Sequence, residues 1–443
     1  MSAQSPQVRQ PPATPTYILR GHAAAIHALQ IFHQNLRLVS GDADGWIVVW
    51  DLVSKRPRAT WKAHDGAVLE VKGFSFGNGA VTEVFTVYRH GRDHKLRVWR
   101  FSLQDEESLQ KVLPVDIEKT SSTAASQPWL VHSLPVNALN FCAFSMVFLP
   151  PDKANTASDA SEAPKENTSL SSVLIAVPNA LNSGAIDLFH LPQERRICTI
   201  PADTEVQTGM VMAANLVISP SGELYVASAY EDGRVMVHGC RGSLQEKDLT
   251  QSTKTPWKWE KLYVCRAHSQ PVLSLHVSPA GNYFFSSSAD AVLAKHPIPS
   301  LGSPGHAPEE LPIRSINTKH AGQQGVRIRS DGKIFATAGW DSRVRVYSCK
   351  TMKELAVLKW HKDGCYAVAF ADVDVFEVRE KSDEEKPTVS PNDNGNQENQ
   401  LAGRAETEFS LATVHRQRSE KVQNTHWLAA GSKDGKISLW DIY

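Results

Sequence analysis

Short apolar segments alternate with polar turns along almost the whole chain. Segments such as "AIHALQIF", "WIVVW", "PVLSLHVS" and "RVRVY" alternate apolar and polar residues with a period of two. This alternation is typical of β-strands that bury one face, and the Gly, Asp, Asn and Ser residues between the segments are typical of tight turns. Helical periodicity is nearly absent. The pattern therefore predicts an all-β chain built from short strands.

One stretch of this pattern returns along the chain with the same spacing of polar and aromatic residues. "LVSGDADGWIVVWD" at residues 38–51 reappears as "LAAGSKDGKISLWD" at residues 428–441. A copy has an upstream histidine, a hydroxyl or small residue, and an Asp before a strand that ends in an aromatic residue. Seven copies can be placed, five of them well, whereas "VPNALNSGAIDLF" and "VASAYEDGRVMVH" are weaker. The marker residues of the five are His22, Ser40, Asp44 and Trp50; His64, Asp93 and Trp99; His268, Ser286, Asp290 and His296; His320, Thr337, Asp341 and Tyr347; and His361, Asp434 and Trp440.

These repeats predict both the fold and the role of their marker residues. Units of about forty residues with a Gly-His start and a Trp-Asp end resemble WD repeats, and seven of them predict a seven-bladed β-propeller. In WD-repeat blades the His, Ser/Thr, Asp and Trp side chains form a hydrogen-bonded network, and a buried His or Asp is costly without such partners. The resemblance therefore assigns the marker residues to structure, and not to catalysis.

The ends of the chain belong to one closed ring. The segment "TYILR" at residues 16–20 is expected to pair with "KISLWDIY" at residues 436–443, which leaves no open sheet edge. The expected organisation is a disordered tail at residues 1–15 and a single propeller at residues 16–443. Polar insertions at residues 152–172 and 374–423, in the third and seventh blades, are expected to be disordered. Irregular stretches at residues 103–127, 241–256 and 299–312 are expected to connect blades.

Composition narrows the classes of function. Among 443 residues, 47 Lys and Arg balance 47 Asp and Glu, so the formal net charge is zero. This balance argues against a chain whose main task is to bind nucleic acid or a membrane. The six cysteines are scattered without a C-x-x-C pair, which favours free thiols in a reducing compartment. The proline-rich beginning lacks the apolar core of a secretory signal.

The sequence offers few candidate catalytic or ligand-binding motifs. The sequence has no G-x-S-x-G, no complete P-loop and no H-E-x-x-H, so no catalytic residue, metal or cofactor is predicted. Trp257 and Trp259 alternate with lysines, and an outer strand explains them better than a base-stacking surface. Ser382 in "KSDEEK" precedes acidic residues and is a candidate phosphorylation site that could create a docking motif.

The sequences around the first and last repeats limit the resemblance to one family. "PTYILRGHAAAIHALQIFHQNLRLVSGDADGWIVVWDL" and "HWLAAGSKDGKISLWDIY" resemble the fungal ASTRA-associated protein 1 family, and also its animal relative, the guanine-nucleotide-binding-protein β-subunit-like protein. The resemblance implies a non-enzymatic subunit of the nuclear ASTRA complex, with a role in chromatin regulation and in maturation of phosphatidylinositol-3-kinase-like kinases. The implied partners are Tel2/Tti-type cochaperones, a Tra-type kinase relative and RuvB-like ATPases. The cytoplasm is a second expected location.

Three other classes of propeller protein are alternatives to this family. A G-protein β subunit needs a long N-terminal helix, which the first fifteen Pro- and Gln-rich residues do not provide. A cullin ubiquitin-ligase substrate receptor is disfavoured because neither Trp50-Asp51 nor Trp440-Asp441 is followed by Arg two residues later. A histone-tail or phosphopeptide reader remains an alternative, and it would need a charged pocket at the central channel. Partner-binding residues are not predicted.

Overall fold

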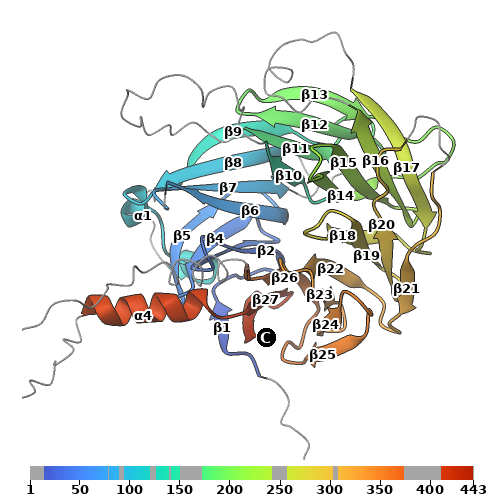
Figure 1. Ribbon diagram of the computed structural model, residues 1–443. Helices are drawn as coiled ribbons and strands as arrows, with labels where there is room; N and C mark the ends of the chain where they lie inside the picture. The colour runs from blue at the N-terminus through green and yellow to red at the C-terminus, as the bar shows by residue number, and fades with distance from the viewer. Residues whose placement is uncertain are drawn as a thin grey trace, which may run out of the picture.

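The computed structural model is a ring of seven β-sheets (Figure 1). The structure describes residues 14–77, 79–88, 94–119, 126–138, 141–149, 172–241, 257–302, 308–373 and 411–442. Each sheet has four antiparallel strands. The prediction of a seven-bladed all-β propeller is therefore confirmed, and all seven copies of the repeat fall on blades, the two weaker ones included.

The blades are numbered in chain order, each from its innermost strand outward. Blade 1 consists of β2 (Ile26–Phe32), β3 (Arg37–Asp42), β4 (Trp46–Asp51) and β5 (Arg56–Lys62). Blade 2 consists of β6 (Val68–Phe76), β7 (Val81–Tyr88), β8 (Lys95–Ser102) and β9 (Trp129–Pro135). Blade 3 consists of β10 (Ser145–Phe148), β11 (Val173–Pro178), β12 (Ile186–Leu191) and β13 (Arg195–Ile200). Blade 4 consists of β14 (Val211–Ile218), β15 (Leu224–Tyr230), β16 (Arg234–Arg241) and β17 (Lys258–Arg266).

The last three blades complete the ring. Blade 5 consists of β18 (Val272–Val277), β19 (Tyr283–Ser288), β20 (Val292–Pro297) and β21 (Arg314–Asn317). Blade 6 consists of β22 (Gln323–Ile328), β23 (Ile334–Gly339), β24 (Val344–Ser348) and β25 (Glu354–Leu358). Blade 7 consists of β26 (Cys365–Phe370), β27 (Trp427–Ser432), β28 (Lys436–Asp441) and, as its outermost strand, β1 (Tyr17–Arg20).

The N-terminal strand closes the ring as the sequence predicts. β1 pairs antiparallel with β28, with Tyr17 opposite Leu439 and Arg20 opposite Lys436. The turn between β27 and β28 also packs against blade 1. Gly435 has a φ of 72°, and a Cβ there would lie 2.4 Å from the carbonyl oxygen of His22. Glycine is required at this turn because a side chain would collide with the neighbouring blade.

The hydrophobic core lies between blades. Seven buried clusters are found in the described chain, and each joins residues of two neighbouring blades. The cluster between blades 7 and 1 includes Trp427, Ile437 and Leu439 together with Ile26 and Leu29. Both faces of the middle strands are covered in this arrangement, so β3 and β27 are buried along their whole length. The seven innermost strands surround a central channel.

The connections between strands correct two expectations. The stretches predicted to connect blades lie instead inside blades 2, 4 and 5, between the third strand and the outermost strand. The first of them holds α1 (Asp105–Ser108) and the 3-10 helix η1 (Pro114–Lys119). A blade can accommodate such an insertion because the insertion lies before the outermost strand, at the outer edge of the sheet.

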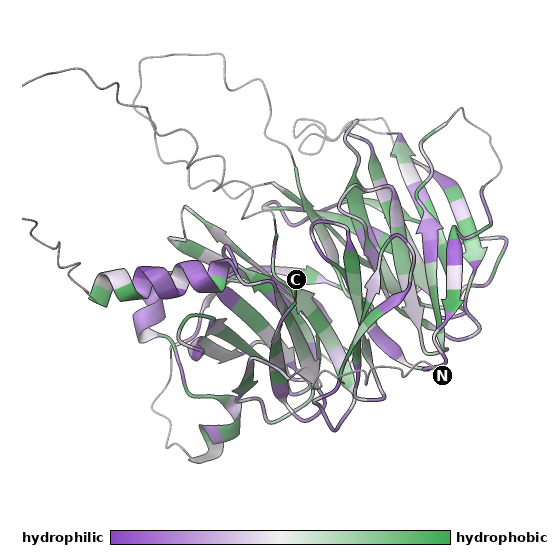
Figure 2. Ribbon diagram, turned by 60° about the horizontal axis from the view of Figure 1, so that its bottom comes forward, coloured by the Kyte–Doolittle hydropathy of each residue, from purple (hydrophilic) through white to green (hydrophobic). Residues whose placement is uncertain are grey.

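The second correction concerns the seventh blade, where the predicted insertion at residues 374–423 ends in a helix. α4 (Leu411–Gln423) projects from the ring (Figure 1) and is largely hydrophilic (Figure 2). Its polar sequence has no apolar stripe to signal a helix, and its last turn is fixed by packing: Val422 and Gln423 are buried. The predicted tail at residues 1–15 and the insertion at 152–172 lie outside the described residues, apart from Thr14, Pro15 and Ser172.

Candidate functional site

Blade 1 contains a complete hydrogen-bonded network, with one residue different from the prediction. His22 Nε2 lies 2.7 Å from Ser40 Oγ, and the Trp50 indole donates to the same oxygen at 2.8 Å. His22 Nδ1 contacts Asp42 at 2.7 Å, and the side chains of His22 and Asp42 are fully buried. Asp44 is exposed in the turn, where its amide donates to Asp42. Asp42 lies on the same strand face as Ser40, and it therefore takes the place predicted for Asp44.

Blade 5 closes its network with histidine in place of tryptophan. His268 lies 2.8 Å from Ser286 Oγ and 3.2 Å from Asp290. His296 contacts Ser286 at 2.8 Å, and the hydroxyl of Tyr263 at 2.9 Å. Burial lowers the pKa of His296 to about 3, so this imidazole is neutral at physiological pH. Burial alone would raise the pKa of Asp290, but hydrogen bonds from His268 and two backbone amides outweigh it and lower that pKa.

Blade 7 obtains its hydroxyl from a strand that sequence reasoning did not consider. Ala430 stands at the hydroxyl position of the repeat, and its partner in the β27–β28 register is Ser438. Ser438 Oγ contacts His361 Nε2 at 2.8 Å and accepts a bond from the Trp440 indole, also at 2.8 Å. Asp434 lies 3.8 Å from His361 and is bound by Lys436 at 2.7 Å.

Blades 2 and 6 depart further from the predicted pattern. In blade 2, Thr86 on β7 contacts His64 at 2.8 Å and the Trp99 indole at 3.3 Å, whereas Asp93 lies outside the described residues. Thr86 was not predicted, because the turn that follows it is longer than in the other copies. In blade 6, the side chain of His320 is 44% exposed and 3.7 Å from Asp341, whose carboxylate is bound by Arg345 through two hydrogen bonds. Thr337 and Tyr347 are buried.

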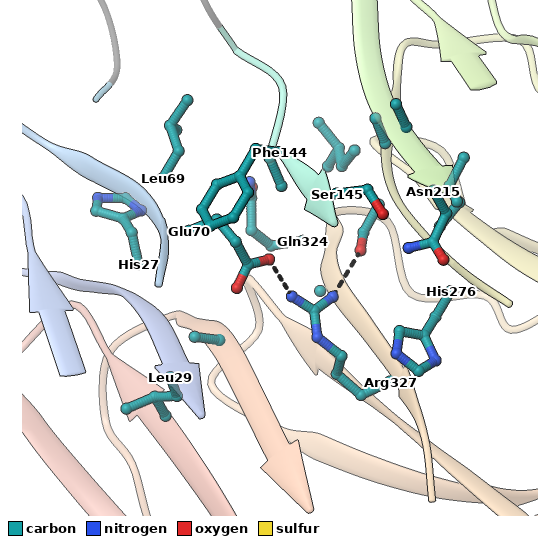
Figure 3. A pocket seen from close by; sticks show the side chains of 18 of the residues that line it. His27, Leu29, Leu69, Glu70, Phe144, Ser145, Asn215, His276, Gln324 and Arg327 are labelled. Carbon is teal, nitrogen blue, oxygen red and sulfur yellow. Dashed lines mark hydrogen bonds and ion pairs between the residues drawn. The ribbon is translucent and has the colours of Figure 1, made fainter. Parts of the chain in front are cut away.

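The central channel contains charged residues that sequence reasoning did not find. A cavity of about 180 Å³ is lined by residues from all seven innermost strands. Glu70 on β6 and Arg327 on β22 form an ion pair of 2.5 Å across it (Figure 3), although their blades are not neighbours. Arg327 also donates to the carbonyl of Val326 at 3.0 Å. Lys72, on the same strand as Glu70, also lines the cavity. No sequence pattern links strands so far apart in the chain.

The electrostatics of the channel follow from this crowding of cations. Burial lowers the pKa of Lys72; Glu70 opposes this effect, and Arg327 adds to it. His276 on β18 has its pKa held well below the usual value by burial and by the charges of Arg327 and Lys72. Its Nδ1 accepts a hydrogen bond from the amide of Ile328 at 3.2 Å, which leaves the proton of the neutral ring on Nε2.

A second hollow lies where blades 7, 1 and 2 meet. A groove of about 740 Å³ is lined by the β2–β3 turn, by part of β6 and by Asp372. Asn35 is buried there and donates to the carbonyls of Asp372 at 2.8 Å and Gln423 at 3.2 Å, and it accepts from the amide of Asp372 at 2.8 Å. Asn35 thus links Asp372, which precedes the polar segment of blade 7, to Gln423, the last residue of α4.

Of the remaining predicted features, Ser382 lies outside the described residues. Trp259 lies on β17, the outermost strand of blade 4, and packs with Trp257 against the core. Among the described residues, no three His, Cys, Asp or Glu side chains cluster closely enough to hold a metal ion, and no helix is long and apolar enough to cross a membrane. None of the six cysteines forms a disulfide, and burial raises the pKa of Cys198, Cys240, Cys349 and Cys365 to about 12.

The ring and its hydrogen-bonded blades define a WD-repeat β-propeller. The family model described as ASTRA-associated protein 1 matches residues 15–440. The protein of that name from Aspergillus niger is 99% identical over 443 residues and covers both chains completely. The Aspergillus flavus relative is 63% identical over 99% of this chain and its own full length, and the Schizosaccharomyces pombe relative is 36% identical over 81% of this chain and 93% of its own. The chain therefore belongs to the ASTRA-associated protein 1 family, as the sequence resemblance indicated.

Proposed function

We propose that this chain is a non-enzymatic scaffold subunit of the nuclear ASTRA complex. The observation that carries the proposal is the family match, which spans the propeller from β1 to β28. A rigid ring with loops on two faces suits the assembly of other proteins, and its function resides in those surfaces. On this proposal it contributes to chromatin remodelling and to cochaperone-assisted maturation of phosphatidylinositol-3-kinase-like kinases. Its partners are Tel2/Tti-type cochaperones, a Tra-type kinase relative and RuvB-like ATPases.

The helix α4 is the part of the surface best suited to contact such a partner. Six of its thirteen residues are exposed, and its buried residues Val422 and Gln423 lie in its last turn. A helix that is polar on all sides gains little from its own fold, and such helices often bridge to another body. Arg418 and Lys421 are exposed cations, whereas Arg416 is paired with Glu420 at 3.4 Å. The expected occupant is an acidic surface of an ASTRA subunit.

The test is purification of the tagged protein from its own cells, with mass spectrometry of the proteins that co-elute. Wild type is compared with the double variant Arg418→Glu/Lys421→Glu, and with Lys350→Glu/Lys353→Glu, where two exposed lysines beside the β24–β25 turn change in the same way. We expect Tel2/Tti-type, Tra-type or RuvB-like proteins with wild type and the control, and a several-fold lower yield with the α4 variant. Recovery of cullin adaptors or histones alone would reject the ASTRA assignment. Equal recovery with the α4 variant would reject only the role of α4.

The nuclear location is tested separately. A fluorescent fusion at the N-terminus should accumulate in the nucleus, with a weaker cytoplasmic signal. A uniformly cytoplasmic signal in growing cells would contradict the nuclear assignment while leaving the family assignment in place.

A further inference from the structure

The charges that line the central cavity do not balance. Glu70 is the one carboxylate among the residues described as lining it, whereas Lys72 and Arg327 are both cations. Arg327 already holds Glu70 at 2.5 Å. No hydrogen bond or ion pair satisfies the Lys72 ammonium among the described residues. The cavity therefore keeps one positive charge without a close counterion.

The neutral polar groups around this charge include hydrogen-bond donors. The neutral ring of His276 offers its Nε2 proton, because Nδ1 already accepts from the amide of Ile328. The amide of Asn215 lies on the adjoining wall, near His276 (Figure 3). These groups come from β6, β14, β18 and β22, so four blades present donors to one space. A group placed there would need to supply acceptors and negative charge.

The Lys72 ammonium lowers the stability of the fold, and a bound ligand of opposite charge would remove this destabilisation. An ammonium group without a counterion in a confined space is unfavourable, and burial accordingly lowers the pKa of Lys72. Replacing Lys72 by an apolar residue of similar shape would relieve that cost. A residue that lowers stability in a cavity is a candidate for binding a ligand of opposite charge.

The size of the cavity limits the ligand. About 180 Å³ is below the roughly 300–1,000 Å³ of pockets that hold drug-sized molecules. A nucleotide or a folded cofactor does not fit, whereas one acidic or phosphorylated side chain does. A peptide could present such a side chain to the channel.

We propose that the central channel binds an oxyanion group of a partner peptide, a carboxylate or a phosphate, between Lys72, Arg327 and His276. This proposal goes beyond the scaffold function and does not rest on it, since the site belongs to the propeller alone. The positive charge of Lys72 meets the oxyanion directly. Arg327 keeps its bonds to Glu70, Val326 and Ser274 and presents its remaining N–H groups, and His276 donates from Nε2.

The test is calorimetric titration of the full chain with three peptides. One is a hexaglutamate, one is a glycine-rich peptide with a single phosphoserine, and the third is that peptide without the phosphate. Wild type should bind at least one anionic peptide and should not bind the third. Binding of the phosphopeptide alone identifies a phosphoryl ligand, and binding of the hexaglutamate alone identifies a carboxylate.

Two variants separate the site from the rest of the surface. Lys72→Met should weaken anionic peptide binding at least tenfold, whereas Lys62→Met, the same change at an exposed lysine at the end of β5, should change it less than twofold. Lys72→Met should also unfold at a temperature no lower than wild type, because it removes an uncompensated charge. If Lys72→Met fails to fold, Lys72→Gln gives the neutral variant and Lys72→Arg should retain binding.

The proposal is overturned if wild type binds no anionic peptide, or if the neutral Lys72 variant binds as tightly as wild type. It is also overturned if a lysine-rich peptide competes for the channel, since that would make Glu70 the binding group. None of these outcomes depends on which proteins co-purify from cells, so failure of this proposal and failure of the ASTRA assignment are distinguishable.

Discussion

Blades 1 and 6 have the same types of marker residue and use them differently. In blade 1, His22, Asp42, Ser40 and Trp50 form a closed and buried network. In blade 6, the His320 ring is exposed and is separated from the buried Thr337 and Tyr347. The composition of the repeat is therefore not enough to predict the network.

The difference has a cause on β24. Val48 is the register partner of Ser40 in blade 1, and Arg345 is the register partner of Thr337 in blade 6. Arg345 binds both carboxylate oxygens of Asp341, at 3.1 and 2.6 Å. A bidentate Arg–carboxylate pair is stronger than a single histidine bond. Blade 6 has Gly339 at the position of Asp42. Its Asp341, at the position of Asp44, is held by Arg345, while His320 stays 3.7 Å away and 44% exposed.

The largest expected effect distinguishes the two aspartates of blade 1. Asp42→Ala should lower the free energy of unfolding by about 4 kcal/mol, because it leaves His22 buried without its partner and removes the bonds to the amides of Asp44 and Trp46. Asp44→Ala should change it by less than about 0.5 kcal/mol, as expected for an exposed turn residue. Urea unfolding of both variants measures the difference. Equal losses would contradict the assignment of the network position to Asp42 alone.

The histidines of blades 1 and 6 should differ almost as much. His22→Ala should cost about 3 kcal/mol, because Ser40 and Asp42 each lose their bond to the imidazole, while Asp42 keeps its backbone amides. His320→Ala should cost less than about 0.5 kcal/mol, since its side chain is 44% exposed and, within the described chain, has no hydrogen bond of the kind that His22 makes. Thermal unfolding of the two variants under one condition makes the comparison. A substantial loss with His320→Ala would show that blade 6 depends on this ring after all.

The hydroxyl of blade 7 offers a smaller effect and a rescue. Ser438→Ala should cost about 2 kcal/mol, because His361 and the Trp440 indole both lose the same oxygen. The double variant Ala430→Ser/Ser438→Ala returns a hydroxyl to the opposite residue of the same register pair, where the other repeats have it. It should recover at least half of the loss, measured by denaturant unfolding. A double variant no more stable than Ser438→Ala would show that β28 alone can place the oxygen.

The effect in blade 5 is a pH dependence, and it is the smallest when taken per pH unit. The pKa of His296 falls from 6.5 to about 3 on folding, so between these values the unfolded chain binds the extra proton. The free energy of unfolding should therefore decrease as the pH falls from 6.5, by about 1 kcal/mol per pH unit. His296→Phe should reduce this slope by about that amount, whatever its effect on stability at pH 7. Slopes that match between wild type and variant would contradict the burial of a neutral imidazole.

The number of blades, their strands and the closure of the ring could all be predicted from the sequence. Alternation with a period of two, Asp-Gly turns and the repeated spacing are local signals, and they specify strands wherever they occur. The pairing of β1 with β28 follows because a ring of whole repeats needs its first strand to complete the last blade. A further signal was present and not used: Ser40 and Asp42 are two residues apart on one strand, so they share a face.

Only the tertiary structure decided which side chains meet. Ser438 substitutes for Ala430 because two strands bring them opposite each other, and Arg345 on β24 binds Asp341 in the turn that precedes this strand. Glu70 and Arg327 are 257 positions apart in the chain, and they meet because the ring brings β6 and β22 to one channel. Strand formation depends on neighbouring residues in the sequence, whereas hydrogen bonds and ion pairs depend on distances in space. The sequence by itself therefore determined the propeller, and the folded ring determined the chemistry of its blades and its channel.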